Sequence, residues 1–302
     1  MLTEKALKQD VNVVNQSNGL YVEIKDYQRR WFDSTADFVW KITLPERVSK
    51  DSQGQPKVLP SRTYTLNMPL EIHHGPVIFA KDGVHFGFGY ASSELTIPQE
   101  LQQQIGEQFT QSSTLPQVDM SVLVNYMNRS RFSVNLPEFE MVSKDGEAKF
   151  DWMGMKSHVT ITSKLDHING DMKLAGLDVE KREMKASIRD AESEYDLYQS
   201  EGGLYIGQAS LSLPSIIVQN KETKIFELVK LYIHSKSEVD GGLFHSFLKA
   251  SLDSIYSHGK TYGPGIFKIS IKNLDADVLA KINKLANQMQ NSSEAEKQKA
   301  ML

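Results

Sequence analysis

Apolar and polar side chains alternate residue by residue along most of the chain. Successive side chains of a β-strand point to opposite faces, so each such run predicts a strand with one apolar face. Gly, Pro, Asn or Asp residues separate most of the runs, as is typical of the turns between strands. The clearest runs predict strands within residues 38–44, 64–72, 86–90, 118–124, 132–136, 159–165, 184–188, 209–213 and 267–271.

The one-sided alternation also indicates how these strands pair. Parallel sheets are buried on both faces and have continuous apolar strands, whereas antiparallel sheets commonly have one polar face. The short polar segments 144–146 and 169–171 each resemble the turn of a hairpin. The sequence therefore predicts a mainly β (α+β) fold: an elongated, curved antiparallel meander with a few packing helices.

Three segments have helical patterns. Residues 3–17 begin with a capping residue, Thr3, and end at Asn18-Gly19, a common C-terminal cap. Residues 98–111 carry apolar side chains four residues apart after Pro98. The third helix, residues 274–289, combines acidic residues at its start with an apolar stripe: Val278, Leu279, Ile282, Leu285, Ala286 and Met289.

Two further segments have less regular patterns. Residues 243–256 fit both a helix and a strand, and we predict a strand because Asp240-Gly241-Gly242 could form a hairpin turn before them. Residues 46–62 are polar and predict a mobile loop.

The patterns divide the chain into three parts. We expect an N-terminal helix in residues 1–18, an elongated β-rich domain in residues 19–273, and an amphipathic helix with a polar tail in residues 274–302. Residues 75–79 (Gly-Pro-Val-Ile-Phe) resemble residues 263–267 (Gly-Pro-Gly-Ile-Phe), so two related β units with a boundary near residue 145 are an open alternative.

Composition and charge narrow the function classes. The 302 residues have a net charge of −4, so no basic excess favours a nucleic acid partner. No apolar run reaches the length of a transmembrane helix. The absence of Cys excludes disulfides, thiol catalysis and Cys-ligated zinc, and is compatible with reducing or oxidising compartments.

The common catalytic motifs are absent. Gly259-Lys260-Thr261 lacks the earlier glycine and the following helix of a phosphate-binding loop, and neither a G-x-S-x-G nor an H-E-x-x-H motif occurs. His73 and His74 are neighbours in a predicted strand, so their rings should point to opposite faces and not share a metal. We therefore expect no catalytic residue, no metal site and no cofactor.

Two clusters of side chains could still have a function. Asp190, Glu192, Glu194 and Asp196 should share one strand face. A hydrated acidic sheet edge that discourages aggregation is the favoured interpretation, with weak calcium binding as the alternative. Five aromatic residues predict either a core patch or one wall of an apolar ligand groove: Tyr27, Trp31, Phe32, Phe38 and Trp40.

Several segments together resemble a known family. They are Gly19-Leu20, Val22-Glu23-Ile24, residues 27–36, His74-Gly75-Pro76 and Asn273-Leu274-Asp275-Ala276, and in residues 27–36 the match rests on Phe32, Ser34 and Ala36. Their order and spacing resemble the YdgA family of Gram-negative envelope proteins. Arg30 stands where the family pattern has glycine, so a backbone conformation that requires glycine is not expected there.

The resemblance implies a location but no activity. Family members resemble inner-membrane-anchored periplasmic proteins, so we expect that an N-terminal membrane anchor precedes this chain in the full-length protein and that a further segment follows it. The family is also distantly similar to AsmA-like proteins, which have a β-groove and are implicated in envelope lipid homeostasis. That similarity concerns the fold and is weak support for a function.

Three hypotheses follow. The first is a non-enzymatic envelope module whose curved sheet binds lipid or another apolar ligand. The second is an envelope scaffold that binds protein partners along exposed strand edges or through residues 46–62. An enzyme that uses the acidic residues Glu192 and Glu194 comes third.

Overall fold

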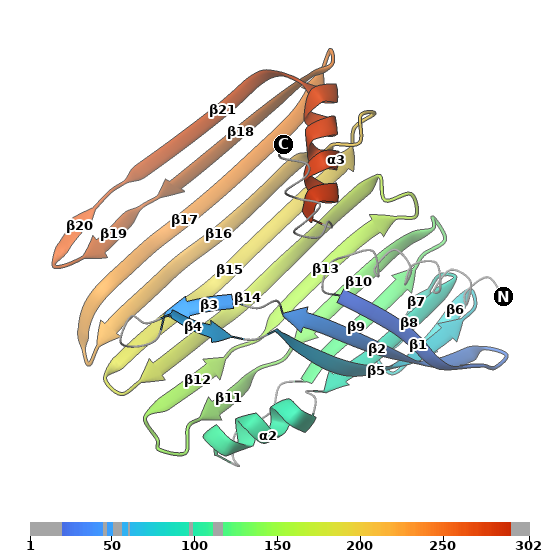
Figure 1. The fold of residues 1–302 in the computed structure, drawn as a ribbon, viewed down its shortest axis with the longest axis horizontal. Helices are drawn as coiled ribbons and strands as arrows, with labels where there is room; N and C mark the ends of the chain where they lie inside the picture. Colours follow the sequence, from blue (N-terminus) through green and yellow to red (C-terminus); the bar gives the residue numbers. More distant parts are fainter. Residues whose placement is uncertain are drawn as a thin grey trace.

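The computed structural model describes residues 20–44, 47–50, 56–59, 61–96, 99–110 and 117–290. Seventeen strands in these residues form one large antiparallel sheet (Figure 1), which confirms the predicted fold class. The helix predicted in residues 3–17 lies outside the described residues. The first half of the sheet contains β1 (Leu20–Arg29), β2 (Asp33–Leu44), β5 (Arg62–His74), β8 (Gly89–Thr96), β9 (Gln117–Val124), β10 (Arg129–Leu136), β11 (Phe139–Val142), β12 (Ala148–Trp152) and β13 (Met155–Thr162).

The second half has longer strands, and the chain meanders through them. Its members are β14 (His167–Lys181), β15 (Met184–Gln199), β16 (Tyr205–Asn220), β17 (Thr223–Asp240), β18 (Leu243–Leu252), β19 (Ser254–Ser257), β20 (Lys260–Tyr262) and β21 (Gly265–Asp275). β14 pairs with β13 and, further along, with β12; β17 likewise pairs with β18 and β19. Among the described residues, no pairing joins β1 to β21, so the sheet is open.

In the part of the chain that the structure describes, two hairpins are separate from the main sheet. β6 (Val77–Ala80) pairs with β7 (Gly83–Phe86), so the run predicted over residues 86–90 is interrupted between β7 and β8. β3 (Arg47–Lys50) pairs with β4 (Pro56–Leu59), which corrects the prediction of a loop over residues 46–62. The register places the β-branched residues Val48 and Val58 opposite each other, a local pairing that the polar composition concealed.

One predicted turn is a turn and the other is not. Gly146 has a φ of 71° in the turn between β11 and β12, as residues 144–146 predicted. Residues 169–171 instead lie inside β14. A Cβ on Gly170 would come within 2.6 Å of the carbonyl oxygen of His158 and 2.5 Å of the Tyr195 hydroxyl, so glycine serves close packing here and not chain reversal.

The pairing register keeps apolar residues beside apolar residues across the sheet. Leu211 of β16 pairs with Ile233 of β17, which pairs with Ala250 of β18. One residue away, Ser210 pairs with His234, and His234 pairs with Lys249. Adjacent residues of a strand face opposite sides, so the sheet has one apolar face and one polar face.

A row of irregular backbone crosses the sheet from the connection between β12 and β13 to the connection between β20 and β21. It contains residues that lie beside one another in neighbouring strands: Gly154, Ala175, Asp190, Pro214, Lys230, Asp253 and Gly263. We call these residues the crease row. Asp190 and Lys230 have φ angles of 50° and 52°, which are uncommon for residues other than glycine.

The hydrophobic alternation slips by one residue at the crease row. In β17 the apolar positions are Phe226 and Leu228 before Lys230, and Leu231 and Ile233 after it. A slip of one residue would move the apolar side chains to the opposite face. The irregular backbone at Lys230 compensates for this slip, so that Leu231 and Ile233 lie on the same face as Phe226 and Leu228. Pro214 is tolerated in an interior strand because the ladder of backbone pairs is interrupted in the crease row.

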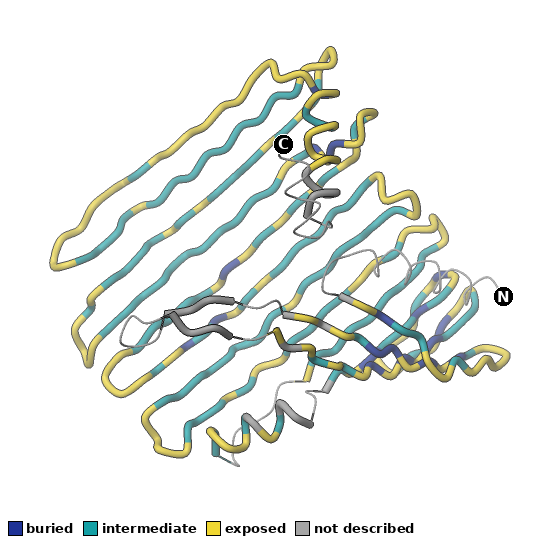
Figure 2. Tube along the Cα trace, viewed as in Figure 1, coloured by how far each residue is buried: buried dark blue, intermediate teal, exposed yellow. Residues whose placement is uncertain are grey.

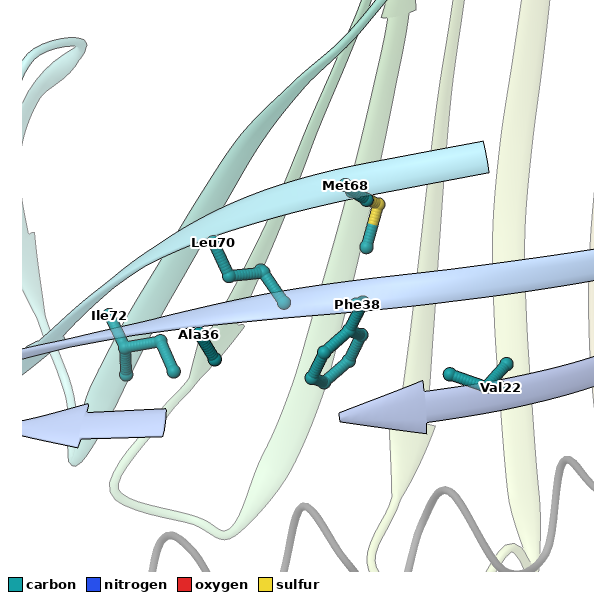
Figure 3. Packing of buried hydrophobic residues seen from close by; sticks show 6 residues of the cluster. All are labelled: Val22, Ala36, Phe38, Met68, Leu70 and Ile72. Atoms are coloured by element: carbon teal, nitrogen blue, oxygen red, sulfur yellow. The ribbon is translucent and has the colours of Figure 1, made fainter. Parts of the chain in front are cut away.

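The N-terminal strands supply the largest core cluster. β1, β2 and β5 cross in front of the strands that follow (Figure 1), and their buried side chains contact Ala91, Leu95 and Met120 of β8 and β9. Figure 3 shows this cluster on the three strands: Val22, Ala36, Phe38, Met68, Leu70 and Ile72. This end of the molecule is therefore a two-layer structure.

Two helices of the described residues lie outside the sheet. α2 (Gln99–Gln108) confirms the helix predicted over residues 98–111, and α3 (Ala276–Gln290) confirms the one predicted over 274–289. The Asp275 carboxylate accepts a hydrogen bond from the Val278 amide at 2.9 Å and caps α3. Residues 243–256 are extended, as predicted.

The crease row leads to a stability prediction. Lys230→Gly should cost less than Lys236→Gly, because glycine adopts the left-handed conformation of Lys230 without strain but only loosens a regular strand at Lys236. Both lysines lie in β17, and each forms an exposed ion pair: Lys230 with Asp253 and Lys236 with Glu238. Each variant therefore loses one ion pair, and this loss is the same in both. Urea denaturation should place the two variants about 1 kcal/mol apart. Equal destabilisation would contradict a strained crease row.

Candidate functional site

The apolar face of the sheet is the most extensive candidate site. In the middle of the sheet its side chains are large and aliphatic, for example Leu174, Leu197, Leu211, Ile233 and Leu248, and all of them are only partly buried. Figure 2 shows that few residues between β10 and β21 are fully buried. In Figure 1 the β3–β4 hairpin crosses in front of β14 and β15, and the middle of β16, β17 and β18 has no described element in front of it. The apolar side chains of these strands contact one another and solvent.

The covering elements lie at the ends. β1, β2 and β5 cover β8 and β9, and α3 lies across the ends of the long strands (Figure 1). Ala276 of α3 is buried against Leu204 and Ile206, with Val239 and Phe244 packed beside them. A sheet normally buries its apolar face against a second layer. Here the N-terminal strands and α3 form that layer at the two ends, and between them the described structure places only the β3–β4 hairpin in front of the sheet (Figure 1).

The polar face carries the ion pairs. Asp178 lies 2.7 Å from Arg189 and 3.4 Å from Lys185, with only 11% of its side chain exposed. The hydrogen bond from Arg189 lowers the pKa of Asp178 to about 2 and outweighs the opposite effect of burial.

Of the predicted acidic residues, Glu192, Glu194 and Asp196 share this face and Asp190 lies in the crease row, and the four do not form an edge. β15 lies between β14 and β16, so the expectation of an acidic sheet edge is wrong; sequence patterns do not show which strands are interior. Glu192 forms an ion pair with Lys173 at 3.1 Å, and an Asp196 carboxylate oxygen lies 2.5 Å from His167 Nε2, at hydrogen-bond distance. Two of the four carboxylates therefore have a partner on the neighbouring strand β14.

A hollow of about 800 Å³ lies on the polar side of β5, β8, β9, β10 and β13. The β6–β7 hairpin closes one side, where the His85 ring stacks on Tyr90 and the Tyr90 hydroxyl donates to Asp82 at 2.5 Å. Burial and this hydrogen bond raise the pKa of Tyr90 to about 12. Elsewhere the lining mixes cations, Arg131 and Lys156, with carboxylates such as Asp119. The hollow therefore has no dominant charge.

A chain of hydrogen bonds joins three side chains from the segments that carry the family resemblance: Tyr27, Ser34 and His74. The Tyr27 hydroxyl donates to Ser34 Oγ at 3.3 Å, and Ser34 Oγ lies 2.9 Å from His74 Nε2. Burial, with Arg29 and His73 nearby, lowers the pKa of His74 and favours its neutral form. The distance would suit a serine nucleophile and its base, but Ser34 is only 1% exposed. Sequence reasoning missed this pair, because the two residues are 40 positions apart.

The structure separates the five aromatic residues that were predicted as a core patch or groove wall. Phe38 is buried, and Tyr27 and Trp40 pack against the N-terminal core. Trp31 and Phe32 lie in the turn between β1 and β2, with 94% and 78% of their surface exposed. The cluster is thus divided between the core and an exposed turn.

The comparison with protein families matches residues 1–302, the whole chain, to the model DUF945, described as a bacterial protein of unknown function. The chain belongs to this family. No curated protein and no solved structure gives a match. For this DUF945 chain the function must therefore be argued from its own geometry.

The other residues of the segments that carry the family resemblance have structural roles in the DUF945 chain. Asn273, Leu274 and Asp275 end β21, and Ala276 begins α3 with its amide bonded to the Gly242 carbonyl. Gly75, with a φ of 127°, and Pro76 connect β5 to the β6–β7 hairpin. The described residues contain no group of three or more potential metal ligands, and no helix among them is long and apolar enough to span a bilayer.

The buried Asp178 leads to a pH prediction. Its pKa is about 2 in the folded protein and 3.8 as a free side chain, so its stabilising effect is complete above about pH 4 and is lost as the pH falls to about 2. Asp178→Asn should lower stability at neutral pH by about 2 kcal/mol and weaken its dependence on pH over this range. Urea denaturation at pH 7 and between pH 4 and 2 measures both effects. An unchanged acid dependence would contradict the pairing.

Proposed function

We propose that this chain is a non-enzymatic envelope protein that binds lipid acyl chains, or another elongated apolar ligand, on the open apolar face of its sheet. The observation that carries the proposal is the large part of that face, between the N-terminal strands and α3, that the described elements leave uncovered. Large exposed apolar surfaces on proteins mark binding sites for partners, membranes or apolar ligands. Ion pairs on the opposite face keep the back of the sheet hydrated.

The dimensions of the face suit acyl chains. From β10 to β21 the face extends over eight neighbouring strand positions, which corresponds to about 34 Å at the usual strand spacing. One bilayer leaflet is about 15 Å deep in hydrocarbon. A whole acyl chain can therefore lie on the face and remove its aliphatic side chains from water.

We also propose a periplasmic location, with an inner-membrane anchor in the full-length protein. The resemblance of residues 27–36, 74–76 and 273–276 to the YdgA family supports this location. The distant similarity to AsmA-like proteins supports the choice of a lipid ligand. A protein with a lipid-binding face would have its ligands in the adjacent membrane.

Charge placed on the apolar face should weaken ligand binding. The double variant Leu211→Asp and Ile233→Asp puts two carboxylates where the acyl chain would lie, and should weaken binding of cis-parinaric acid at least about tenfold. Fluorescence titration measures the affinity, and mass spectrometry of organic extracts identifies lipid purified with the protein.

The same two strands provide the matched control. Ser210→Asp and His234→Asp place equal charges one residue away, on the polar face. They should leave binding unchanged. Equal binding by both double variants, or no binding by the unsubstituted chain, would contradict the proposal.

The proposed lack of catalysis can be tested at Ser34. Its hydroxyl is buried, so a fluorophosphonate probe should not label it although His74 is 2.9 Å away. Ser34→Ala should lower stability by about 1–2 kcal/mol, because His74 and Tyr27 lose a buried partner. Thr43→Ala, which removes an exposed hydroxyl pair with Thr63, is the control and should cost less. Labelling that disappears in Ser34→Ala would favour a hydrolase.

A scaffold for other envelope proteins is the second candidate. β21 is an edge strand, which pairs only with β18 among the described residues and is exposed from Ile266 to Asp275. Such an edge can add a strand from another chain. Reproducible protein adducts from crosslinkers placed on β21, without bound lipid, would favour this function.

A further inference from the structure

A second apolar surface lies at the end of the molecule where β1 meets β2. Backbone hydrogen bonds join the segments there: the His74 amide bonds to the Phe32 carbonyl, the Gly75 amide to Phe88, and the Phe88 amide to Val124. The Tyr126 hydroxyl bonds to the Pro76 carbonyl, and its ring contacts Phe88 edge to face. Thus the β1–β2 turn, the β6–β7 hairpin and the β9–β10 turn are neighbours (Figure 1).

Large apolar side chains project into solvent from all three segments. The least exposed of them is 59% exposed. We call this group the aromatic end: Trp31, Phe32, Phe79, Phe86, Phe88 and Met127. None of the six lines the hollow on the polar face, so they form a projecting surface and not a pocket.

The β6–β7 hairpin shows why this exposure is not a by-product of core packing. Its inner side chains, Ile78 and His85, pack toward the sheet, where Ile78 is 2% exposed and His85 stacks on Tyr90. Its outer side chains pair across the hairpin as Val77 with Phe86 and Phe79 with Val84. A hairpin in contact with water would normally have polar residues on this outer side.

Cations accompany the aromatic end. Arg29 and Arg30 precede Trp31, and Arg129 follows the turn that contains Met127. Arg30 has a long contact with Asp33, at 3.8 Å, and neither Arg29 nor Arg129 forms an ion pair with a carboxylate of the described residues. Aromatic rings beside arginines are typical of surfaces that enter the interfacial region of a bilayer.

We propose that the aromatic end docks the protein on the surface of an anionic lipid bilayer. The rings and Met127 enter the boundary between headgroups and acyl chains, while the three arginines contact lipid phosphates. A bilayer accommodates projecting side chains of unequal height, whereas a protein partner would need a complementary surface. This inference is separate from acyl-chain binding on the sheet face, since no residue is shared.

Vesicle binding by the 302-residue chain tests the proposal. The protein should sediment with vesicles of phosphatidylcholine and phosphatidylglycerol, and less with phosphatidylcholine alone. The double variants Trp31→Ala with Phe32→Ala, and Phe79→Ala with Phe86→Ala, should each lower the partition about tenfold. Trp31 is a built-in reporter, because Trp40 and Trp152 are partly buried. Its emission should shift to the blue on binding, and Trp31→Phe should remove the shift.

Matched controls separate this surface from general hydrophobicity and from the sheet face. Val278→Ala with Ile282→Ala removes similarly exposed apolar side chains from α3, and Leu211→Asp with Ile233→Asp alters the sheet face. Both should leave the vesicle partition unchanged. Partition unaffected by the aromatic-end variants would overturn the proposal. If the unsubstituted chain does not bind vesicles but self-associates, and the aromatic-end variants abolish the self-association, the proposal would be overturned in favour of a second copy of this chain.

Discussion

The structure depends on the separation of apolar and polar side chains between the two faces of a single sheet. Ion pairs such as Asp178 with Arg189 lie on one face, and aliphatic pairs such as Leu211 with Ile233 lie on the other. A shift of one residue in any strand would exchange the two faces. The crease row is where this constraint is most visible, because the sequence pattern and the backbone change there together.

The covering layers limit how much of the apolar face becomes a core. The N-terminal strands bury Phe38, Leu70 and Ile72, and α3 buries Leu204 and Ile206. Between these ends, side chains are buried mainly by their neighbours on the same face. Stability in the centre therefore comes from ladder hydrogen bonds and lateral contacts, which leaves the face accessible without requiring an opening movement.

Local alternation predicted most strands and two helices, because burial on one face imposes a period of two and the helices have their own period. This pattern failed to predict the structure at positions whose surroundings are made by residues distant in sequence. Gly170 resembles a turn residue until Tyr195 and His158 are known to lie against it. The prediction of an acidic sheet edge in β15 is wrong, because the neighbours of a strand are a property of the whole sheet and not of its own sequence. The contact between Ser34 and His74 likewise requires the pairing of β2 with β5.

The two exposed apolar surfaces differ in shape and composition, which argues against a common origin in incomplete folding. The sheet face is broad, aliphatic and bordered by covered ends, so it can surround part of a long ligand. The aromatic end projects from three turns, is rich in rings and has arginines beside it. A chain that only lacked a covering layer would leave the sheet face open. It would not also place Phe79 and Phe86 on the outer side of a hairpin whose inner side already buries Ile78.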